Sequence, residues 1–479
     1  MNAYIVVLVL IVAGLLTVSL TRLRTVKTGA DFLVAGRQLS APVLIFTLLS
    51  SWIGAGSLFA GAENAYRNGF AALWQPAGGW VALLIIYFVA PRARKFAQFT
   101  VPDLLETRYG VATRILGIIA ILLAYTAITS YQFKGGGDIL ALTTGVTPGQ
   151  GTLIIAVFVI VFTAIAGMSS VAYVDLAIGL LVSVTLVGAV PVLLAHSGGW
   201  AHIHSLLPAD RFQVLGHLTF WKAFAYFLPV FLLMLGNQSM YQKFFSAKSA
   251  SDARRAVVGW VIGTVILETV IIIIAVIGSA LFHGATDLKP REIIPYTARH
   301  GLPALLGAIL MGAVFAKVIS TGNNYLFSPA TNLVHDVYSR FLRPTASNRQ
   351  VLLVSRLMVV LLGILAFAQS FQESILAVAL YAYTVYSAAI TPVVMAAFFW
   401  KRATRQAAVT SVALGTVVTV AWNVLPQVSH GPWLEAMAKV DAIYPALIAS
   451  VLALLVVSLL TPTPRPEQWQ PFYESDGNG

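Results

Sequence analysis

The sequence contains thirteen apolar runs of roughly 20 residues, the length at which an α-helix crosses the hydrocarbon core of a bilayer. Inside lipid, each backbone N–H and C=O needs a partner within the chain, and a helix supplies those partners locally. Hydrophobic residues make up 58% of the 479 positions and charged residues only 10%, a balance that water-soluble domains do not show. The chain is therefore predicted to be an all-α polytopic membrane protein with 13 transmembrane helices.

We expect these helices near residues 4–20, 41–66, 71–90, 113–141, 151–168, 171–195, 219–243, 255–282, 303–336, 352–370, 373–399, 406–425 and 441–461. No loop is longer than roughly 20 residues, so no separate soluble domain is expected. The sequence has no cysteine, no Walker motif, no zinc-ligand spacing and no nucleophile elbow. We therefore expect no enzymatic activity, and any pumping must draw on gradients of ions or of solute.

Lysine and arginine are distributed unevenly over the connecting segments. If the side that follows the first helix is the inside, the inner segments hold 21 of the 30 basic residues and the outer segments hold seven, while Lys134 and Lys317 lie within spans. This bias predicts a multi-pass protein of a bacterial-type inner membrane, with the N-terminus outside and the C-terminus cytoplasmic. It also explains the formal charge of +12, so no nucleic-acid partner is expected.

Two of the apolar runs carry small and polar residues at their centres. The run Ser-Ser-Trp-Ile-Gly-Ala-Gly-Ser at 50–57 has two glycines and three serines, and Gly-Asn-Gln-Ser at 236–239 repeats the pattern in the second half of the chain. Close helix packing through small residues is one explanation. The other is a pair of interrupted helices whose freed carbonyls hold a cation or a substrate at the midplane of the membrane.

The helix expected around 313–338 places an ionisable residue deep in apolar sequence. Lys317, Ser320, Thr321 and Asn324 are spaced i, i+3, i+4 and i+7, so they share one face. An ammonium group in hydrocarbon is costly, so this face must look into protein or water, and it marks a functional site. The pattern indicates a cation site, or the remains of one.

Further ionisable residues, mostly acidic, fall within or beside the predicted spans. Glu268 has no partner nearby in the sequence, and we expect it to face the interior of the bundle. Lys134 and Asp138 are four residues apart on one predicted helix and can neutralise each other. Asp175, near the start of the helix at 171–195, is either a solvated acid at a helix end or part of the site.

In order and spacing, several motifs resemble those of the sodium/solute symporter family over nearly the whole chain: DFLVAGR at 31–37, WIGAG at 52–56, Tyr66 and Gly69, TVPDL at 100–104, AYVD at 172–175, AKS at 247–249, Ser320 with Thr321, and FFWKR at 398–402. The resemblance implies a five-plus-five inverted repeat (LeuT-like) core with one extra N-terminal and two extra C-terminal helices. It divides the chain into an N-terminal helix and cytoplasmic loop (1–40), a first repeat (41–195), an extracellular loop (196–218), a second repeat (219–402), two C-terminal helices (403–461) and a cytoplasmic tail (462–479).

In that family a sodium ion lies between the first and eighth core helices. The resemblance places its ligands on the backbone carbonyls of Ser50, Ile53 and residue 317 and on the hydroxyls of Ser320 and Thr321. The family usually has alanine at position 317, and this chain has lysine. Because two cations in one low-dielectric site repel strongly, we hypothesise that Lys317 stands in for sodium, with Asp175 as its partner. The alternative is that Lys317 turns away and sodium still binds.

By analogy with the family, the substrate would contact nine residues that offer amides, hydroxyls and indoles: Trp52, Ser57, Trp74, Gln75, Gln132, Asn237, Gln238, Tyr241 and Tyr383. Such groups suit a small polar or zwitterionic solute. We therefore expect a secondary active transporter that imports such a solute by alternating access, coupled to Na⁺, to H⁺ or to no ion, and that uses no other cofactor. A facilitator or exchanger is an alternative, and the short tail after Leu460 argues against a membrane sensor. The expected partners are the solute and the lipid bilayer, with the chain as a monomer or a weak homo-oligomer.

Overall fold

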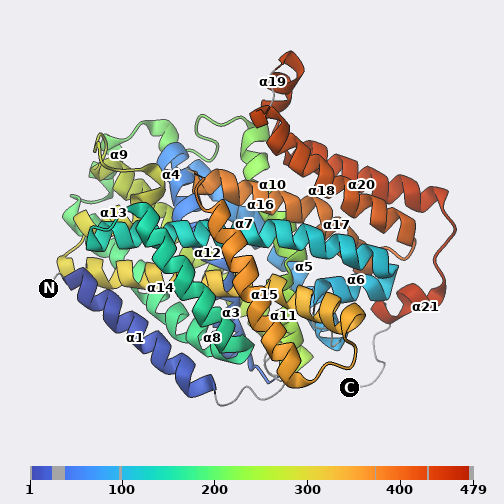
Figure 1. The fold of residues 1–479 in the computed structure, drawn as a ribbon. Coiled ribbons are helices and arrows are strands. Elements are labelled where there is room, and N and C mark those ends of the chain that lie inside the picture. The colour runs from blue at the N-terminus through green and yellow to red at the C-terminus, as the bar shows by residue number, and fades with distance from the viewer. Residues whose placement is uncertain (1–2, 24–37, 97–99, 373, 429–430, 474–479) are drawn as a thin grey trace.

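The computed structural model describes residues 3–23, 38–96, 100–372, 374–428 and 431–473, and its regular structure is helical (Figure 1). Within these ranges, the only pairing of extended chain is an isolated bridge between Leu39 and Ala247. The predicted all-α fold is therefore confirmed. The motif at 31–37 lies outside the described residues, as do the side chains of Ala172 and Tyr173.

Eleven helical segments of the described chain are long and apolar enough to cross a membrane. Two shorter apolar stretches lie within α1 (Ala3–Leu23) and in α3 (Ala41–Trp52). The chain is a multi-span helical membrane protein, and the number of thirteen spans stays a prediction.

The other long helices cover the remaining predicted spans: α5 (Trp74–Phe96), α7 (Val111–Thr144), α8 (Pro148–His196), α10 (Phe220–Gly236), α12 (Ala250–Leu281), α14 (Ala304–Thr331), α15 (Asn348–Gln369), α16 (Ile375–Ala389), α18 (Arg405–Val428) and α20 (Ile443–Leu460). Helix α8 covers two of those spans. Its 49 residues contain two separate apolar windows, Pro148–Ile165 and Val174–His196. A straight helix of that length would extend about 74 Å, more than twice the hydrocarbon core of a bilayer.

Shorter elements complete the fold: α4 (Ala62–Asn68), α6 (Val101–Tyr109), α9 (Trp200–Leu206), α11 (Gln238–Ser246), α13 (Ile293–His300), α17 (Thr391–Phe399), α19 (Pro432–Ala438), α21 (Pro466–Trp469), and the π- or 3₁₀-helical turns η2 (Gly56–Gly61), η3 (Gly69–Leu73), η4 (Ala209–Phe212), η5 (Pro290–Glu292), η6 (Asn332–Leu342) and η7 (Gln470–Phe472). Helix α6, which the sequence analysis left in a loop, has clear local signals. Thr100 caps its first turn by accepting a hydrogen bond from the backbone of Asp103, and Gly110 ends it with φ +91°.

Both expected helix interruptions are present. Helix α3 ends at Trp52, and the extended Ile53 (φ −80°, ψ 103°) separates it from η2 and α4. Helix α10 ends at Gly236, and the extended Asn237 (φ −61°, ψ 113°) separates it from α11. The segment just before α3 lies beside the end of α11, where the backbone N–H of Leu39 donates a hydrogen bond to the carbonyl of Ser246 at 3.1 Å.

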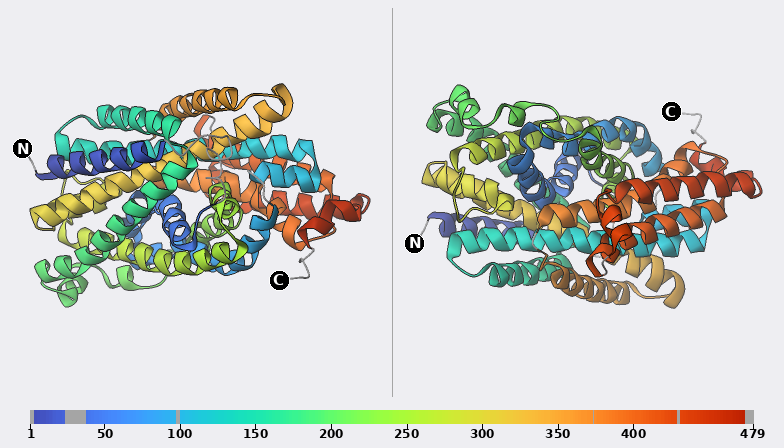
Figure 2. Two further views of the ribbon diagram at one scale, coloured as in Figure 1. Left: turned by 90° about the horizontal axis from the view of Figure 1, so that it is seen from below. Right: turned by 90° about the horizontal axis from the view of Figure 1, so that it is seen from above.

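Helix α14 is one of the most deeply buried spans of the described chain. It packs against α1, α7 and α8, and all residues from 310 to 331 are buried. Helix α5 packs against α10 and α12, while the C-terminal helices α18 and α20 run side by side along one edge of the molecule (Figures 1 and 2). Any polar group on α14 therefore faces protein, which is why its chemistry is confined to the bundle interior.

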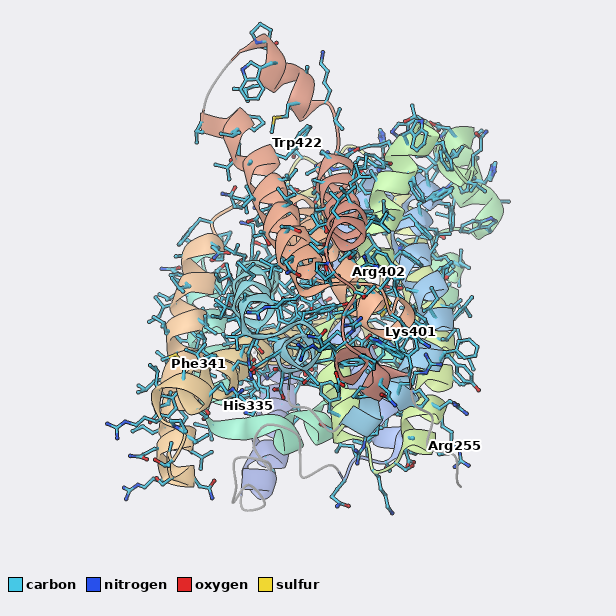
Figure 3. The ribbon with its side chains drawn as sticks, turned by 90° about the vertical axis from the view of Figure 1, so that its right-hand side faces the viewer. Arg255, His335, Phe341, Lys401, Arg402 and Trp422 are labelled. Atoms are coloured by element: carbon cyan, nitrogen blue, oxygen red, sulfur yellow. The ribbon has the colours of Figure 1, made fainter. Side chains whose placement is uncertain are left out.

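A buried ionic network joins α6, α7 and η6 at one end of the bundle. The guanidinium of Arg114 contacts the carboxylates of Glu106 and Asp336 and lies 3.3 Å from that of Asp103. Its side chain is 2% exposed and that of Asp336 is fully buried. His335, labelled in Figure 3, lies 3.6 Å from Asp103. The charge of Arg114 is therefore neutralised inside the fold.

Asp138 has a long-range partner. Its carboxylate accepts a hydrogen bond from Arg291 of η5 at 2.8 Å, and its side chain is 1% exposed. The sequence analysis paired Asp138 with Lys134, four residues away, and missed this contact because η5 lies more than 150 residues later in the chain.

Replacing Arg114 with leucine should destabilise the protein strongly, because the buried carboxylate of Asp336 would lose its cation, at a cost of about 3–5 kcal/mol. Arg340 offers a matched control, since it contacts Glu106 at 2.8 Å but its side chain is 54% exposed. Arg340→Leu should cost at most about 1 kcal/mol. Thermal unfolding in detergent measures both, and equal losses for the two variants would contradict this account.

The stability that Glu106 contributes should depend on pH. Burial acts to raise the pKa of Glu106, but hydrogen bonds from Arg114 and Arg340 outweigh it and hold the pKa below the ordinary 4.5. A lowered carboxyl pKa stabilises the fold above the unfolded-state value, and this contribution is lost as the pH falls through the folded-state value. The melting temperature of Glu106→Gln should therefore lie below that of the native protein at pH 7 and approach it as the pH falls below 4.5. A gap that stays constant with pH would refute the assignment.

Candidate functional site

A cluster of oxygens lies where the break in α3 meets α14. The hydroxyl oxygen of Thr321 is 2.9 Å from the carbonyl oxygen of Ser50 and 3.3 Å from that of Ile53. It is also 3.0 Å from the carbonyl of Lys317. The Ser320 hydroxyl lies 2.9 Å from the Ser50 hydroxyl. One hydroxyl proton bonds to one carbonyl at a time, so the other oxygens keep lone pairs for a cation. The structure thus brings all five predicted ion-ligand positions together.

The local sequence explains how this cluster forms. The extended conformation of Ile53 ends α3, and the carbonyls of a helix's last turn have no intrahelical partner. Gly54 then allows α14 to approach, because a Cβ at this position would lie 2.6 Å from the side chain of Thr321. The glycine in the middle of the apolar run is required by this contact as well as by the break.

Asp175 of α8 lies directly beside the oxygen cluster and is fully buried. Its carboxylate accepts hydrogen bonds from the hydroxyls of Ser320 and Thr47, the latter at 2.6 Å, and from the Asn324 side-chain amide at 3.3 Å. The solvated helix-end alternative is therefore wrong for this residue. Asp175 supplies the negative charge nearest to the predicted ion ligands.

Two buried lysines face this single carboxylate. The side-chain nitrogen of Lys317 is buried and makes no hydrogen bond to any residue of the described chain. Lys243 of α11 is fully buried, and its nitrogen lies 2.9 Å from the side-chain oxygen of Asn324 and 3.3 Å from the backbone oxygen of Ser239. Asp175 acts electrostatically on both lysines. Lys243 was not among the predicted site residues, although its place four residues after Ser239 in the interrupted helix was a signal.

A cavity opens beside the break of α3 and is walled by α5, α7, α10, α12, α14 and α16. Its described lining consists of Trp52, Gly56, Ser57, Gly61, Gln75, Pro76, Tyr131, Gln132, Val230, Leu233, Glu268, Ile271, Ile272, Thr321, Tyr325 and Tyr383. Thr321 belongs both to this lining and to the oxygen cluster. A solute in the cavity and a cation in the cluster would therefore share one wall.

Five of the nine predicted substrate residues line this cavity: Trp52, Ser57, Gln75, Gln132 and Tyr383. Two of them also hold the surrounding backbone or side chains in place. Gln132 accepts a hydrogen bond from the backbone N–H of Ala55 at 2.9 Å, which satisfies a donor exposed by the break. The Tyr383 hydroxyl lies 3.2 Å from the Tyr131 hydroxyl and links α16 to α7 across Gly56, where a Cβ would collide with Tyr383.

The other four predicted substrate residues lie outside the described lining. The Asn237 side chain bonds to the hydroxyls of Tyr125 and Tyr325, at 2.9 and 3.1 Å. The Gln238 side chain bonds to Ser328 and Asn332 and accepts from the backbone of Val101. The Tyr241 hydroxyl donates to the carbonyl of Leu235, and the Trp74 indole donates to that of Val214. Their polar groups hold the interrupted α10–α11 segment and the N-terminal end of α5, and contact with substrate stays a prediction.

Glu268 of α12 faces the cavity, which confirms the expected interior position. One carboxylate oxygen accepts from the Trp52 indole at 3.1 Å and from the Ser57 hydroxyl at 3.0 Å. The other accepts from the Trp80 indole at 2.9 Å. Trp80 was missed by the sequence analysis, because a tryptophan inside an apolar span gives no local sign of its partner.

Comparison with known proteins agrees with this arrangement. The model of the family described as the sodium:solute symporter family matches residues 32–415. The high-affinity proline transporter PutP of Bacillus subtilis (strain 168) is 26% identical over an alignment of 461 residues that covers 91% of this chain and 93% of that protein. A sodium/proline symporter of Staphylococcus aureus is 23% identical over 477 residues, covering 94% of this chain and 90% of that protein.

Solved structures show the same fold. A Na⁺-coupled sialic acid symporter in a substrate-bound outward-open state superposes with a TM-score of 0.83 at 16% identity, covering 97% of this chain and 99% of that one. The nucleobase-cation-symport-1 family transporter Mhp1, in a closed conformation, superposes with a TM-score of 0.59 at 14% identity over 92% of this chain and 97% of that one. The resemblance to this class of transporters, inferred from motifs, is confirmed.

Gly54→Ala should destabilise the protein by about 1–3 kcal/mol, because the added methyl group would overpack the contact with Thr321. Gly188→Ala in α8 is a matched control, since nothing lies within 4 Å of a Cβ there. The control should keep or slightly raise the melting temperature, because alanine favours helix more than glycine does. If both variants melted like the native protein, Thr321 would not be packed against the break.

Proposed function

This chain belongs to the sodium:solute symporter family, and we propose that its solute is a small amino acid of the proline type. It is a secondary active transporter and not an enzyme. The proposed path is alternating access to the cavity beside the α3 break. The observation that carries the proposal is that the interruption of α3 adjoins a cavity that carries polar side chains, with the oxygen cluster behind it. Relatives named as proline transporters support the solute class.

The coupling ion is where this chain departs from its family. We propose that the charge of Lys317 takes the place of sodium and that protonation of this residue, or its permanent charge, replaces ion binding. Two buried lysines already share one carboxylate, Asp175, so a sodium ion in the cluster would be a third cation beside a single acid. Two unit charges 4 Å apart repel by about 4 kcal/mol even at an effective dielectric constant of about 20.

The position of the lysine nitrogen also supports this proposal. A buried amine without a hydrogen bond is unstable where it lies and is drawn to oxygens with spare lone pairs. The oxygen cluster begins at the carbonyl of the same residue, so a change of rotamer is the motion needed to bring the nitrogen to it. Conventional sodium coupling is the second candidate, favoured by the one observation that all five oxygens stand together while the amine bonds to none of them.

We further propose that the N-terminus is outside and the C-terminus cytoplasmic, in an inner membrane, with the chain acting as a monomer or a weak oligomer. Among the inner basic residues whose side chains the structure describes, Arg108, Arg114 and Lys243 are buried, and removing these three from the 21 leaves 18 against seven, so the bias persists. The two interruptions, one in 41–195 and one in 219–402, support the proposed division into two inverted repeats.

Lys317→Ala should convert the protein to a sodium-dependent carrier, because it restores the family's usual residue and removes the competing cation. In proteoliposomes, proline uptake by the native protein should be the same in NaCl and in KCl, whereas uptake by Lys317→Ala should rise at least about tenfold in NaCl. The melting temperature of the variant should also rise in NaCl, because a bound ion stabilises the fold by mass action.

Lys222→Ala is the control, since that lysine pairs with Asp441 at the surface and its side chain is 44% exposed. It should behave as the native protein does in both salts. Native uptake that needs sodium would refute the replacement by Lys317 and leave the assignment as a carrier intact.

A further inference from the structure

Glu268 differs from the other buried acids of the described chain in its surroundings. Glu63, Asp138, Glu292 and Asp336 each have an arginine or lysine within 4.0 Å, and Asp175 lies in the field of Lys243 and Lys317. The hydrogen-bond partners of Glu268 are two indoles and a serine, all of them neutral. No lysine, arginine or histidine occurs in the described lining of its cavity. Within the described chain, this carboxylate is the buried acid that lacks a cation.

The hydrogen bonds hold Glu268 as an acceptor. An indole N–H can only donate, and each of the two carboxylate oxygens receives one, from Trp52 and from Trp80. Three donors fix the orientation of the carboxylate. The protein has therefore oriented an acceptor toward a cavity without placing a positive charge there.

An ionisable residue inside a membrane that faces a cavity marks a functional site. The question for Glu268 is which positively charged group pairs with it. A buried charge without a counter-charge is costly. A ligand that brings a positive charge next to Glu268 would therefore bind favourably, because it supplies the missing counter-charge. The same cavity is lined by Trp52, Tyr131, Tyr325 and Tyr383, and aromatic faces attract cations. Carboxylate and rings together favour a positively charged nitrogen.

We propose that Glu268 binds the ammonium group of the transported solute, so that this carrier selects solutes with a positively charged nitrogen. The inference rests on the proposed function, since it concerns the same cavity and the same solute. The inference adds that the positively charged end of a zwitterionic solute lies toward α12. Trp80 is a positioning residue in this scheme, because it holds the carboxylate but is not part of the described lining.

Binding of matched solute pairs to the purified protein tests this role. L-proline is compared with tetrahydrofuran-2-carboxylate, in which an oxygen replaces the ring nitrogen. Trimethylglycine is compared with 3,3-dimethylbutyrate, in which a carbon replaces the quaternary nitrogen. The native protein should bind the nitrogen-bearing member of at least one pair at least about 30-fold more tightly than its twin, as expected when one partner of a buried charge pair is removed. Glu268→Gln should lose this preference, and Glu268→Asp should keep part of it.

The control is Glu435→Gln, which removes an exposed acid of α19 and should leave both affinities unchanged. If Glu268→Gln does not fold, Glu268→Asp and Trp80→Phe test the role of Glu268 instead. Both variants should reduce the ratio of the two affinities within a solute pair. The melting temperature of each variant without solute shows whether it is folded. Equal proline affinity in the native protein and in a folded Glu268 variant would overturn the role of Glu268 and leave the proposed function standing. If the native protein bound neither proline nor trimethylglycine, the proposed solute class would fall, and this inference with it.

Discussion

The hydroxyl of Thr321 facing the carbonyls of the interrupted α3 is the contact on which the rest of the structure depends. A helix that breaks inside a bilayer exposes polar backbone groups that lipid cannot satisfy, so a break persists only where other parts of the protein supply partners. Thr321 supplies one on the carbonyl side at 2.9 Å, and Gln132 supplies another on the N–H side at 2.9 Å. These two side chains come from α14 and α7, so the break, the cavity and the central helix are built as one unit.

Charge determines what this unit can bind. The described interior contains several carboxylates and basic side chains, and most are neutralised by partners far away in sequence, such as Arg114 with Asp336 or Arg291 with Asp138. What remains is a surplus of positive charge at the oxygen cluster and an unbalanced negative charge in the cavity. In our account the first excludes a free metal cation and the second attracts a charged nitrogen, so ion coupling and solute choice both follow from the distribution of buried charge.

Features that depend on local sequence could be predicted. Apolar runs located the spans, and glycine and serine within them located the interruptions at Ile53 and Asn237. The family resemblance placed the ion ligands, which the structure brings together around Thr321. Features that depend on distant contacts could not be predicted: that Lys243 turns inward to Asn324 and that Trp80 reaches Glu268 become visible only when helices far apart in sequence are packed together. Asn237 and Gln238 were assigned to substrate by analogy with the family. Their hydrogen bonds in this structure hold the break itself, and their contact with substrate stays a prediction.

The most direct test of the central claim, that a lysine charge occupies the role of sodium, is equilibrium binding of ²²Na⁺ to the purified native protein. Our account predicts no saturable binding at neutral pH, with a sodium component emerging only when the pH is raised far enough to remove the proton of Lys317. Saturable binding of one sodium ion per chain at neutral pH, with an affinity that does not change with pH, would contradict it.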